Sequence, residues 1–218
     1  MNEVSKLNDL GDYEFSCGNY SAAYEYFKSS IEVDPTGGYA WYRRSLSAEK
    51  LGNYEEFSTG IARAKSFADK DLLCAIRISE IEAQSTLCAE IIKLRVDQCG
   101  SAGYGPHSEV TKDQCEKKIV QAAVDLFDLR FELRHALTEG EVTARAALDL
   151  ATKILSKIEA VAILKPAIFG DFGRFWVSDL YTKIAPRYNN FCAWVNFLAQ
   201  AHPELKIPRY GGIEAKFV

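Results

Sequence analysis

Residues 17–35, "CGNYSAAYEYFKSSIEVDP", contain a tripeptide that decides how the start of the chain folds. Gly-Asn-Tyr at 18–20 returns at 52–54, in "KLGNYEEFSTGIARA", 34 residues later. A period of 34 residues is typical of helix-turn-helix units that stack along a chain. In each unit the glycine would allow the sharp turn between two helices. The recurrence therefore predicts two helical hairpins.

Apolar residues recur at helical spacing on both sides of the first tripeptide. They predict helices over residues 4–17 and 20–33. Asp34-Pro35 should end the second helix, because a proline disfavours helical conformation in the residue before it. A hairpin of this kind cannot bury its apolar face alone, so later helices are expected to cover the second unit.

These residues resemble the tetratricopeptide repeat over about residues 4–69. The first unit carries ten residues on that family's signature positions: Leu7, Leu10, Gly11, Gly18, Tyr20, Ala23, Phe27, Ile31, Asp34 and Pro35. The second unit keeps Trp41, Gly52, Tyr54 and Ala64. It departs from the family at three positions, where glycine, alanine and proline are replaced by Ser45, Phe57 and Asp69. The resemblance implies a scaffold that binds a peptide or protein segment in a groove lined by the first helix of each unit.

The rest of the chain is also predicted to be helical, because no segment alternates convincingly with a period of two. Long helices are expected at 70–98, 111–138 and 141–164, and shorter ones at 172–184 and 187–201. In the first two long helices, second apolar stripes (Leu72, Ile76, Ala83, Leu87 and Ile91; Val120, Val124, Phe127 and Phe131) predict burial on more than one side.

The predicted fold class is all-α, a short tetratricopeptide-like solenoid capped by a long-helix bundle. Four parts are expected along the chain. Residues 1–69 form two repeats, 70–99 a long capping helix, 100–110 a linker, and 111–218 a helical bundle with an aromatic-rich end.

Composition and charge do not favour nucleic acid or a membrane as partner. The net charge is −4; residues 1–139 carry 23 acidic and 16 basic side chains, residues 140–218 carry 7 and 10. Basic residues do interleave with aromatics near the C-terminus, but aromatics at helical spacing more often form a core, so nucleic acid ranks third among the hypotheses. No apolar run is long enough to span a bilayer. The six scattered cysteines and the N-terminus without an export signal favour reduced thiols in the cytoplasm.

The motifs that suggest chemistry are each incomplete. Asp-Phe-Gly at 171–173 lacks the other protein-kinase motifs, and the glycine-rich segment at 100–106 lacks the lysine of a phosphate loop. Neither the histidines nor the cysteines have a metal-binding spacing, so no metal or cofactor is expected. The acidic pair Asp125 and Asp128 is placed on a solvated helix face. The chain is therefore predicted not to be an enzyme.

The family resemblance places a partner-binding surface on the first helix of each unit. Its residues would be Asn8, Asp12, Phe15, Tyr39, Tyr42, Arg43 and Leu46. Tyr39, Tyr42 and Arg43 form the expected anchor, because aromatic rings and arginine dominate many interfaces. The alternative is that Tyr39 or Tyr42 packs against the long helix that follows.

The charge near this surface restricts the partner. Asp9 and Asp12 would repel a C-terminal carboxylate, so a neutral or basic protein or peptide is expected. Dimerisation through the exposed face of the second unit is also left open. The interpretation is a non-enzymatic interaction scaffold, or adaptor. The alternative is a helical enzyme or regulatory domain in residues 110–218 that the repeats dock.

Overall fold

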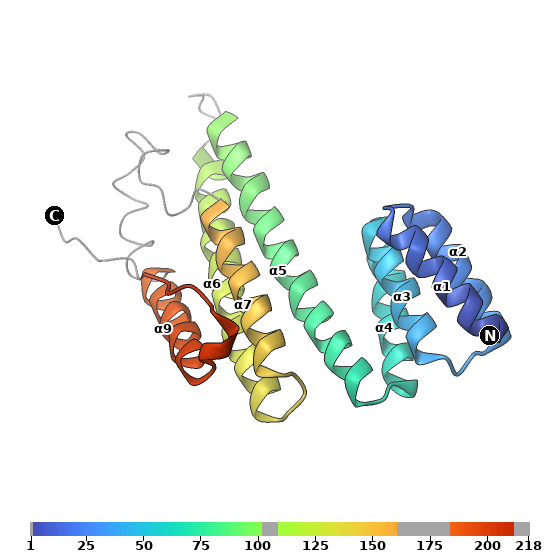
Figure 1. Ribbon diagram of the computed structural model, residues 1–218. Coiled ribbons are helices and arrows are strands. Elements are labelled where there is room, and N and C mark those ends of the chain that lie inside the picture. Colours follow the sequence, from blue (N-terminus) through green and yellow to red (C-terminus); the bar gives the residue numbers. More distant parts are fainter. Residues whose placement is uncertain (1, 102–108, 161–183, 212–218) are drawn as a thin grey trace. The chain divides into compact units, whose positions relative to one another are not determined.

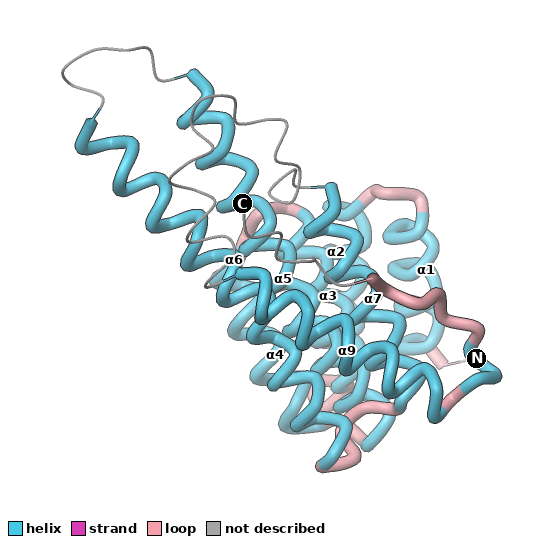
Figure 2. Tube along the Cα trace, turned by 90° about the vertical axis from the view of Figure 1, so that its left-hand side faces the viewer, coloured by secondary structure: helices cyan, strands magenta, loops and turns pink. Residues whose placement is uncertain are grey.

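The computed structural model describes residues 2–101, 109–160 and 184–211. Every element in these ranges is a helix or a connecting loop, so the predicted all-α class is confirmed for them (Figures 1 and 2). The chain divides into two compact units, Met1–Arg77 and Ile78–Val218.

The first unit consists of two helical hairpins and the beginning of a fifth helix. Helix α1 (Glu3–Ser16) pairs with α2 (Tyr20–Val33), and α3 (Gly38–Lys50) pairs with α4 (Tyr54–Phe67). Helix α2 also packs on α3, so the hairpins stack in chain order. This is the tetratricopeptide-like arrangement that the 34-residue period predicts.

The repeated tripeptide has the same role in both hairpins. Gly18 and Gly52 adopt left-handed backbone conformations, with φ of 82° and 78°. The amide of the following asparagine then returns to the end of the preceding helix, where Asn19 N donates to Glu14 O and Asn53 N to Ala48 O, both at 2.9 Å. A left-handed residue that ends a helix with this hydrogen bond is most often glycine.

A glycine lets the two helices of each hairpin approach closely. It lies on the first helix of the first hairpin and on the second helix of the second hairpin. In the first hairpin a Cβ on Gly11 would lie 2.7 Å from ring atoms of Phe27. In the second hairpin the equivalent of Gly11 is Ser45, and the close approach is provided by Gly60 instead. The departure of Ser45 from the family pattern is therefore matched by a glycine on the facing helix.

Helix α5 (Lys70–Ser101) begins in the first unit and continues into the second. Its start is capped by Asp69, whose carboxylate accepts a hydrogen bond from the Leu72 amide at 2.9 Å. Aspartate is a favoured residue at this capping position. The hydrophobic cluster of Ile61, Ala64 and Ile76 joins α4 to the first turns of α5.

The second unit is a bundle of long helices. Beside α5 it contains α6 (Glu109–Thr138), α7 (Ala144–Ala160), α9 (Ala185–Ala201) and a short 3₁₀ turn, η4 (Pro203–Leu205). Helices α6, α7 and α9 pack on one another around an apolar core. The predicted linker 100–110 and the predicted helix 172–184 lie mostly outside the described residues. At the two ends of the predicted linker the structure is helical, since α5 runs to Ser101 and α6 begins at Glu109.

The prediction that the second stripes of the long helices are buried is wrong at two positions. Leu87 on α5 and Phe131 on α6 are 52% and 54% exposed. The other residues of these two second stripes are buried or partly buried. Periodicity identifies the face of a helix on which a residue lies, but it does not show whether another element covers that face.

Candidate functional site

The seven predicted partner-binding residues lie on α1 and α3 of the first unit. We call the surface they form the α1–α3 surface; it comprises Asn8, Asp12, Phe15, Tyr39, Tyr42, Arg43 and Leu46. Two of them, Tyr39 and Arg43, form hydrogen bonds with the carboxylate of a third, Asp12.

Asp12 holds the two helices together at this point. Its Oδ1 accepts a hydrogen bond from Arg43 Nε at 2.6 Å, and its Oδ2 accepts one from the Tyr39 hydroxyl at 2.6 Å. The side chains of Arg43 and Asp12 are 18% and 35% exposed. Charge-assisted hydrogen bonds in a partly desolvated position are stronger than those between neutral groups, so this contact fixes α1 against α3.

Arg43 also lies over aromatic rings. Its guanidinium is 4.3 Å from the centroid of the Phe15 ring and 5.6 Å from that of Phe27. A cation over a ring face is attracted by the ring quadrupole. Arg43 is therefore held by Asp12 and by Phe15, and it is not an independent positive charge facing solvent.

The same environment changes the acidity of Tyr39. Partial burial of the phenol, together with its hydrogen bond to the Asp12 carboxylate, raises the pKa of Tyr39 well above the ordinary tyrosine value. Tyr39 therefore stays protonated and remains a donor to Asp12 through the physiological pH range. The ring itself is 42% exposed and offers apolar area beside the ion pair.

Tyr42 extends the contacts to the next helix. Its hydroxyl donates to the Ala75 carbonyl of α5 at 3.4 Å, and its ring packs against the cluster of Ile61, Ala64 and Ile76. This geometry matches the alternative considered for Tyr42, packing against the long helix. Leu46, one turn after Arg43 on α3, is half-buried.

Asn8 precedes Asp12 by one turn on α1. Its side-chain Oδ1 is buried and has no hydrogen-bond partner among the described residues. A buried carbonyl without a donor costs about 1–3 kcal/mol. Asn8 is therefore an energetically unfavourable residue at the edge of the α1–α3 surface.

Arg44, the neighbour of Arg43, has a structural role that sequence reasoning did not assign. It forms an ion pair with Glu56 of α4 and donates to the Tyr24 hydroxyl of α2 at 2.6 Å. The sequence did contain a signal that Arg43 and Arg44 have different partners, because adjacent residues of a helix point to different faces.

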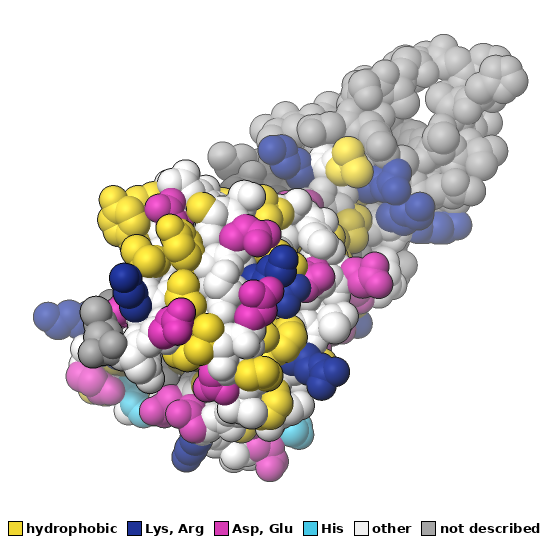
Figure 3. All heavy atoms as spheres, turned by 90° about the vertical axis from the view of Figure 1, so that its right-hand side faces the viewer, with side chains coloured by type: hydrophobic (Ala, Val, Ile, Leu, Met, Phe, Trp, Pro, Cys, Tyr) yellow, Lys and Arg dark blue, Asp and Glu magenta, His cyan; other side chains and the backbone are white. Residues whose placement is uncertain are grey.

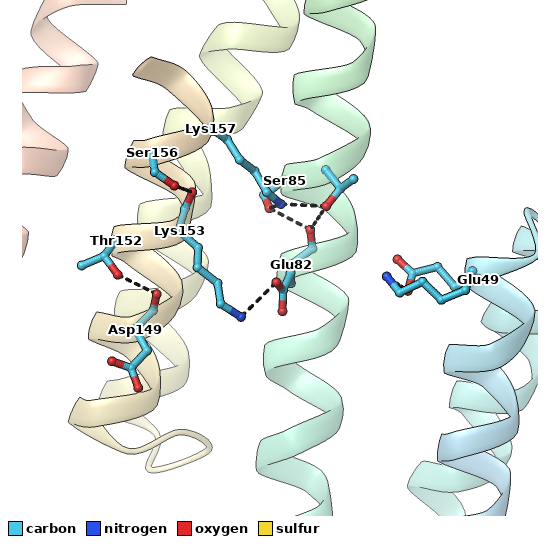
Figure 4. A network of polar contacts seen from close by, with 10 residues as sticks. Glu49, Glu82, Ser85, Asp149, Thr152, Lys153, Ser156 and Lys157 are labelled. Carbon is cyan, nitrogen blue, oxygen red and sulfur yellow. Dashed lines mark hydrogen bonds and ion pairs between the residues drawn. The ribbon is translucent and has the colours of Figure 1, made fainter. Parts of the chain in front are cut away.

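The second unit contains a polar network between α5 and α7 (Figure 4). Lys157 Nζ donates to Ser85 Oγ at 2.8 Å and to Thr86 Oγ1 at 2.7 Å, and Lys153 pairs with Glu82 at 3.1 Å. A serine beside a lysine is one form of activated nucleophile. Here the Ser85 side chain is fully buried and its hydroxyl donates to the Glu82 backbone carbonyl at 2.7 Å. The network joins two helices, and the Ser85 hydroxyl within it is not exposed to solvent.

The aromatic C-terminal region is described only in part. In α9, Tyr188 and Phe191 are buried in the core, as the core interpretation predicts, and Phe127 packs edge-on against Tyr188. The same interpretation is wrong for Phe197, which is 70% exposed. Arg187 lies 3.5 Å from Asp128. Arg174, Lys183 and the tripeptide at 171–173 lie outside the described residues.

Two kinds of feature are absent from the described ranges. Among these residues, no group of three His, Cys, Asp or Glu side chains is placed to hold a metal ion. None of the described helices combines the length and apolar composition needed to cross a bilayer.

Comparison with solved structures shows a likeness to a repeat domain. No family model matches the chain, and no curated protein matches it. The chain is similar to the crystal structure of the P58(IPK) TPR domain, with 19% identity, 93% of this chain covered and a TM-score of 0.36. The match covers 56% of that chain, so this protein spans little more than half of its length.

Proposed function

We propose that this protein is a non-enzymatic adaptor that holds a protein or peptide segment on the α1–α3 surface. The observation that carries the proposal is the assembly of Asp12, Tyr39 and Arg43 around one carboxylate, beside the exposed ring of Tyr39. The side chains are fixed before any partner arrives, so little side-chain entropy is lost on binding.

The electrostatics of this surface support a neutral or basic partner. Residues 1–34 contain seven acidic and two basic side chains. Acidic side chains stand among apolar and basic ones on the face of the first unit shown in Figure 3. Arg43, the one cation among the seven residues of the α1–α3 surface, is already paired with Asp12. It is therefore not available to bind a C-terminal carboxylate. Complementary charge would favour a segment that carries lysine or arginine.

The alternative, an enzyme or regulatory domain in residues 110–218, has less support in the described residues. The buried part of α6, α7 and α9 is apolar, and Ser85, which accepts a hydrogen bond from Lys157, is fully buried. A cytoplasmic setting also remains part of the proposal, supported by the free thiols of Cys17, Cys74 and Cys88.

The test compares two exposed tyrosines of the first unit. Tyr39→Ala removes the ring at the α1–α3 surface, and Tyr54→Ala removes a ring that is 58% exposed at the start of α4. Asp9→Lys and Glu25→Lys form a matched pair of charge reversals at exposed positions on α1 and α2. Each variant would be immobilised, and the proteins retained from a lysate identified and then purified for binding measurements.

We expect a protein that binds the wild type to bind Tyr39→Ala and Asp9→Lys at least tenfold more weakly, with Tyr54→Ala and Glu25→Lys unaffected. Circular dichroism must show all four variants folded. A partner that binds all four variants equally would exclude the α1–α3 surface as its site.

A further inference from the structure

A groove lies between α5 and α6 in the second unit, with a volume of about 370 Å³. Seven side chains line it: Gln84, Leu87 and Cys88 from α5, and Asp125, Asp128, Leu129 and Glu132 from α6. Within each helix the first lining residue is followed by others three and four positions later, a spacing that places them on one helix face. Each helix therefore presents one continuous face to the groove.

The floor of the groove is apolar. Leu129 is buried in the bundle core, whereas Leu87 is 52% exposed. Cys88 also lines the groove and is partly buried; burial, with the nearby Asp125 carboxylate, raises the pKa of its thiol. The thiol is therefore protonated at neutral pH and adds to the apolar surface.

The rim of the groove on α6 is acidic. Asp125 accepts a hydrogen bond from the neutral amide of Gln121 at 2.7 Å, so no charge compensates it in that contact. Asp128 lies 3.5 Å from Arg187, and both of these side chains are substantially exposed. Glu132 follows Asp125 by two helical turns on the same side of the groove.

We propose that this groove docks an amphipathic, lysine- or arginine-bearing helix of a partner protein. Aliphatic side chains of that helix would cover Leu87 and the accessible part of Cys88, and its cations would face Asp125. Charge complementarity with the acidic rim selects a basic occupant. The site lies in the other unit from the α1–α3 surface, so the proposal is independent of the proposed function.

The walls of the groove favour a helix over an extended peptide. Both walls are helices whose central backbone amides and carbonyls are bonded within the helix, and they offer an extended chain no backbone partners. A helix satisfies its own backbone groups and needs only side-chain contacts. Its anchors would recur every three or four residues, as they do for helices bound in apolar grooves of other proteins.

The experiment uses a fluorescein-labelled model peptide with leucines spaced three and four residues apart and lysines beside them. A matched peptide carries glutamate in place of each lysine. Binding to the full chain is measured by fluorescence anisotropy. We expect the lysine peptide to bind, and the glutamate peptide to bind at least tenfold more weakly.

Two pairs of variants locate the site. Leu87→Gln removes the exposed anchor and should weaken binding about tenfold. Leu94→Gln is the control, because Leu94 is 54% exposed on the same helix and does not line the groove. Asp125→Asn should weaken binding about two- to fivefold, and Asp149→Asn, at an exposed position of α7, should not.

Protection of Cys88 gives a second measurement on the unaltered protein. The lysine peptide should slow alkylation of Cys88 several-fold, as quantified on the peptide fragment that contains it, and leave alkylation of the exposed Cys17 unchanged.

Three results would overturn the proposal. The first is no binding of the lysine peptide, as expected if another part of the chain fills the groove. The second is equal binding by Leu87→Gln and Leu94→Gln. The third is a dimer in sedimentation that Leu87→Gln alone dissociates, which would make a second copy the occupant. Tyr54→Ala, which alters neither the groove nor the α1–α3 surface, should leave peptide affinity unchanged.

Discussion

The contact between Gly60 and Ser45 predicts a strong coupling between two substitutions. A Cβ on Gly60 would lie 2.1 Å from Ser45 Oγ and 3.3 Å from Ser45 Cβ, whereas ordinary contact begins at 3.4 Å. Ser45 is buried, and its hydroxyl donates to the Trp41 carbonyl at 2.7 Å. Gly60→Ala therefore forces the Ser45 hydroxyl to leave its hydrogen bond or forces α3 and α4 apart.

The magnitude follows from three contributions. Overpacking of a tight core costs about 1–3 kcal/mol. Loss of the Ser45 hydrogen bond costs about 1 kcal/mol. Replacing glycine by alanine inside a helix stabilises the helix by about 1 kcal/mol. We expect Gly60→Ala alone to lower the free energy of unfolding by about 2 kcal/mol.

The outcome should reverse when Ser45 is first replaced by glycine. Without the Ser45 side chain, the new methyl group meets neither Oγ nor Cβ, and Gly60→Ala should stabilise the protein by about 1 kcal/mol. The coupling in the double-mutant cycle is then about 3 kcal/mol. Urea unfolding followed by circular dichroism measures all four proteins. A coupling below about 0.5 kcal/mol would refute the close approach of α3 and α4 at this point.

Three further predictions concern the candidate site and the second unit. Asp12→Asn should move the pKa of Tyr39 back toward the ordinary value, as followed by tyrosinate absorbance. Because the folded-state pKa of Tyr39 is raised, its contribution to stability should be complete below about pH 10 and decline above it, and Asp12→Asn should reduce that decline. In urea unfolding, Lys157→Met should destabilise the protein by about 1 kcal/mol, because Lys157 is partly buried and donates to two hydroxyls. Lys153→Met should destabilise it by less than about 0.5 kcal/mol, because Lys153 forms an exposed ion pair. Asn8→Ala should raise the unfolding free energy by about 1 kcal/mol, since it removes a buried carbonyl without a partner; an unchanged or lower value would show that the carbonyl is satisfied in solution.

Much of the first unit could be predicted from local sequence. The turns at Gly18 and Gly52 depend on a backbone conformation that glycine adopts readily, and such a requirement is visible in the sequence. Helix α2 likewise begins directly after the turn at Gly18-Asn19 and ends before Asp34-Pro35, as those residues predict. Local chemistry therefore predicted the two hairpins and their stacking order.

Contacts between distant residues could not be predicted in the same way. Arg43 was expected to face a partner, but the structure pairs it with Asp12, 31 residues earlier. Periodicity placed both residues on helix faces without showing that those faces meet. Asp125 and Asp128 were assigned to a solvated face, and both keep exposed side chains. That α5 lies opposite them and forms a groove could not be predicted from the periodicity of α6.

The continuity of α5 limits how the protein can be divided for experiments. The boundary between the two units falls at Arg77–Ile78, inside a helix of 32 residues and not in a loop. A fragment cut there would end in a helical segment of residues 70–77, and isolated helices shorter than about 12 residues rarely persist in water. Unwinding of that segment would withdraw Ile76 from Ile61 and Ala64 and expose the end of the second hairpin. A fragment of the repeats therefore needs the turns of α5 beyond residue 77, although those turns belong to the other unit.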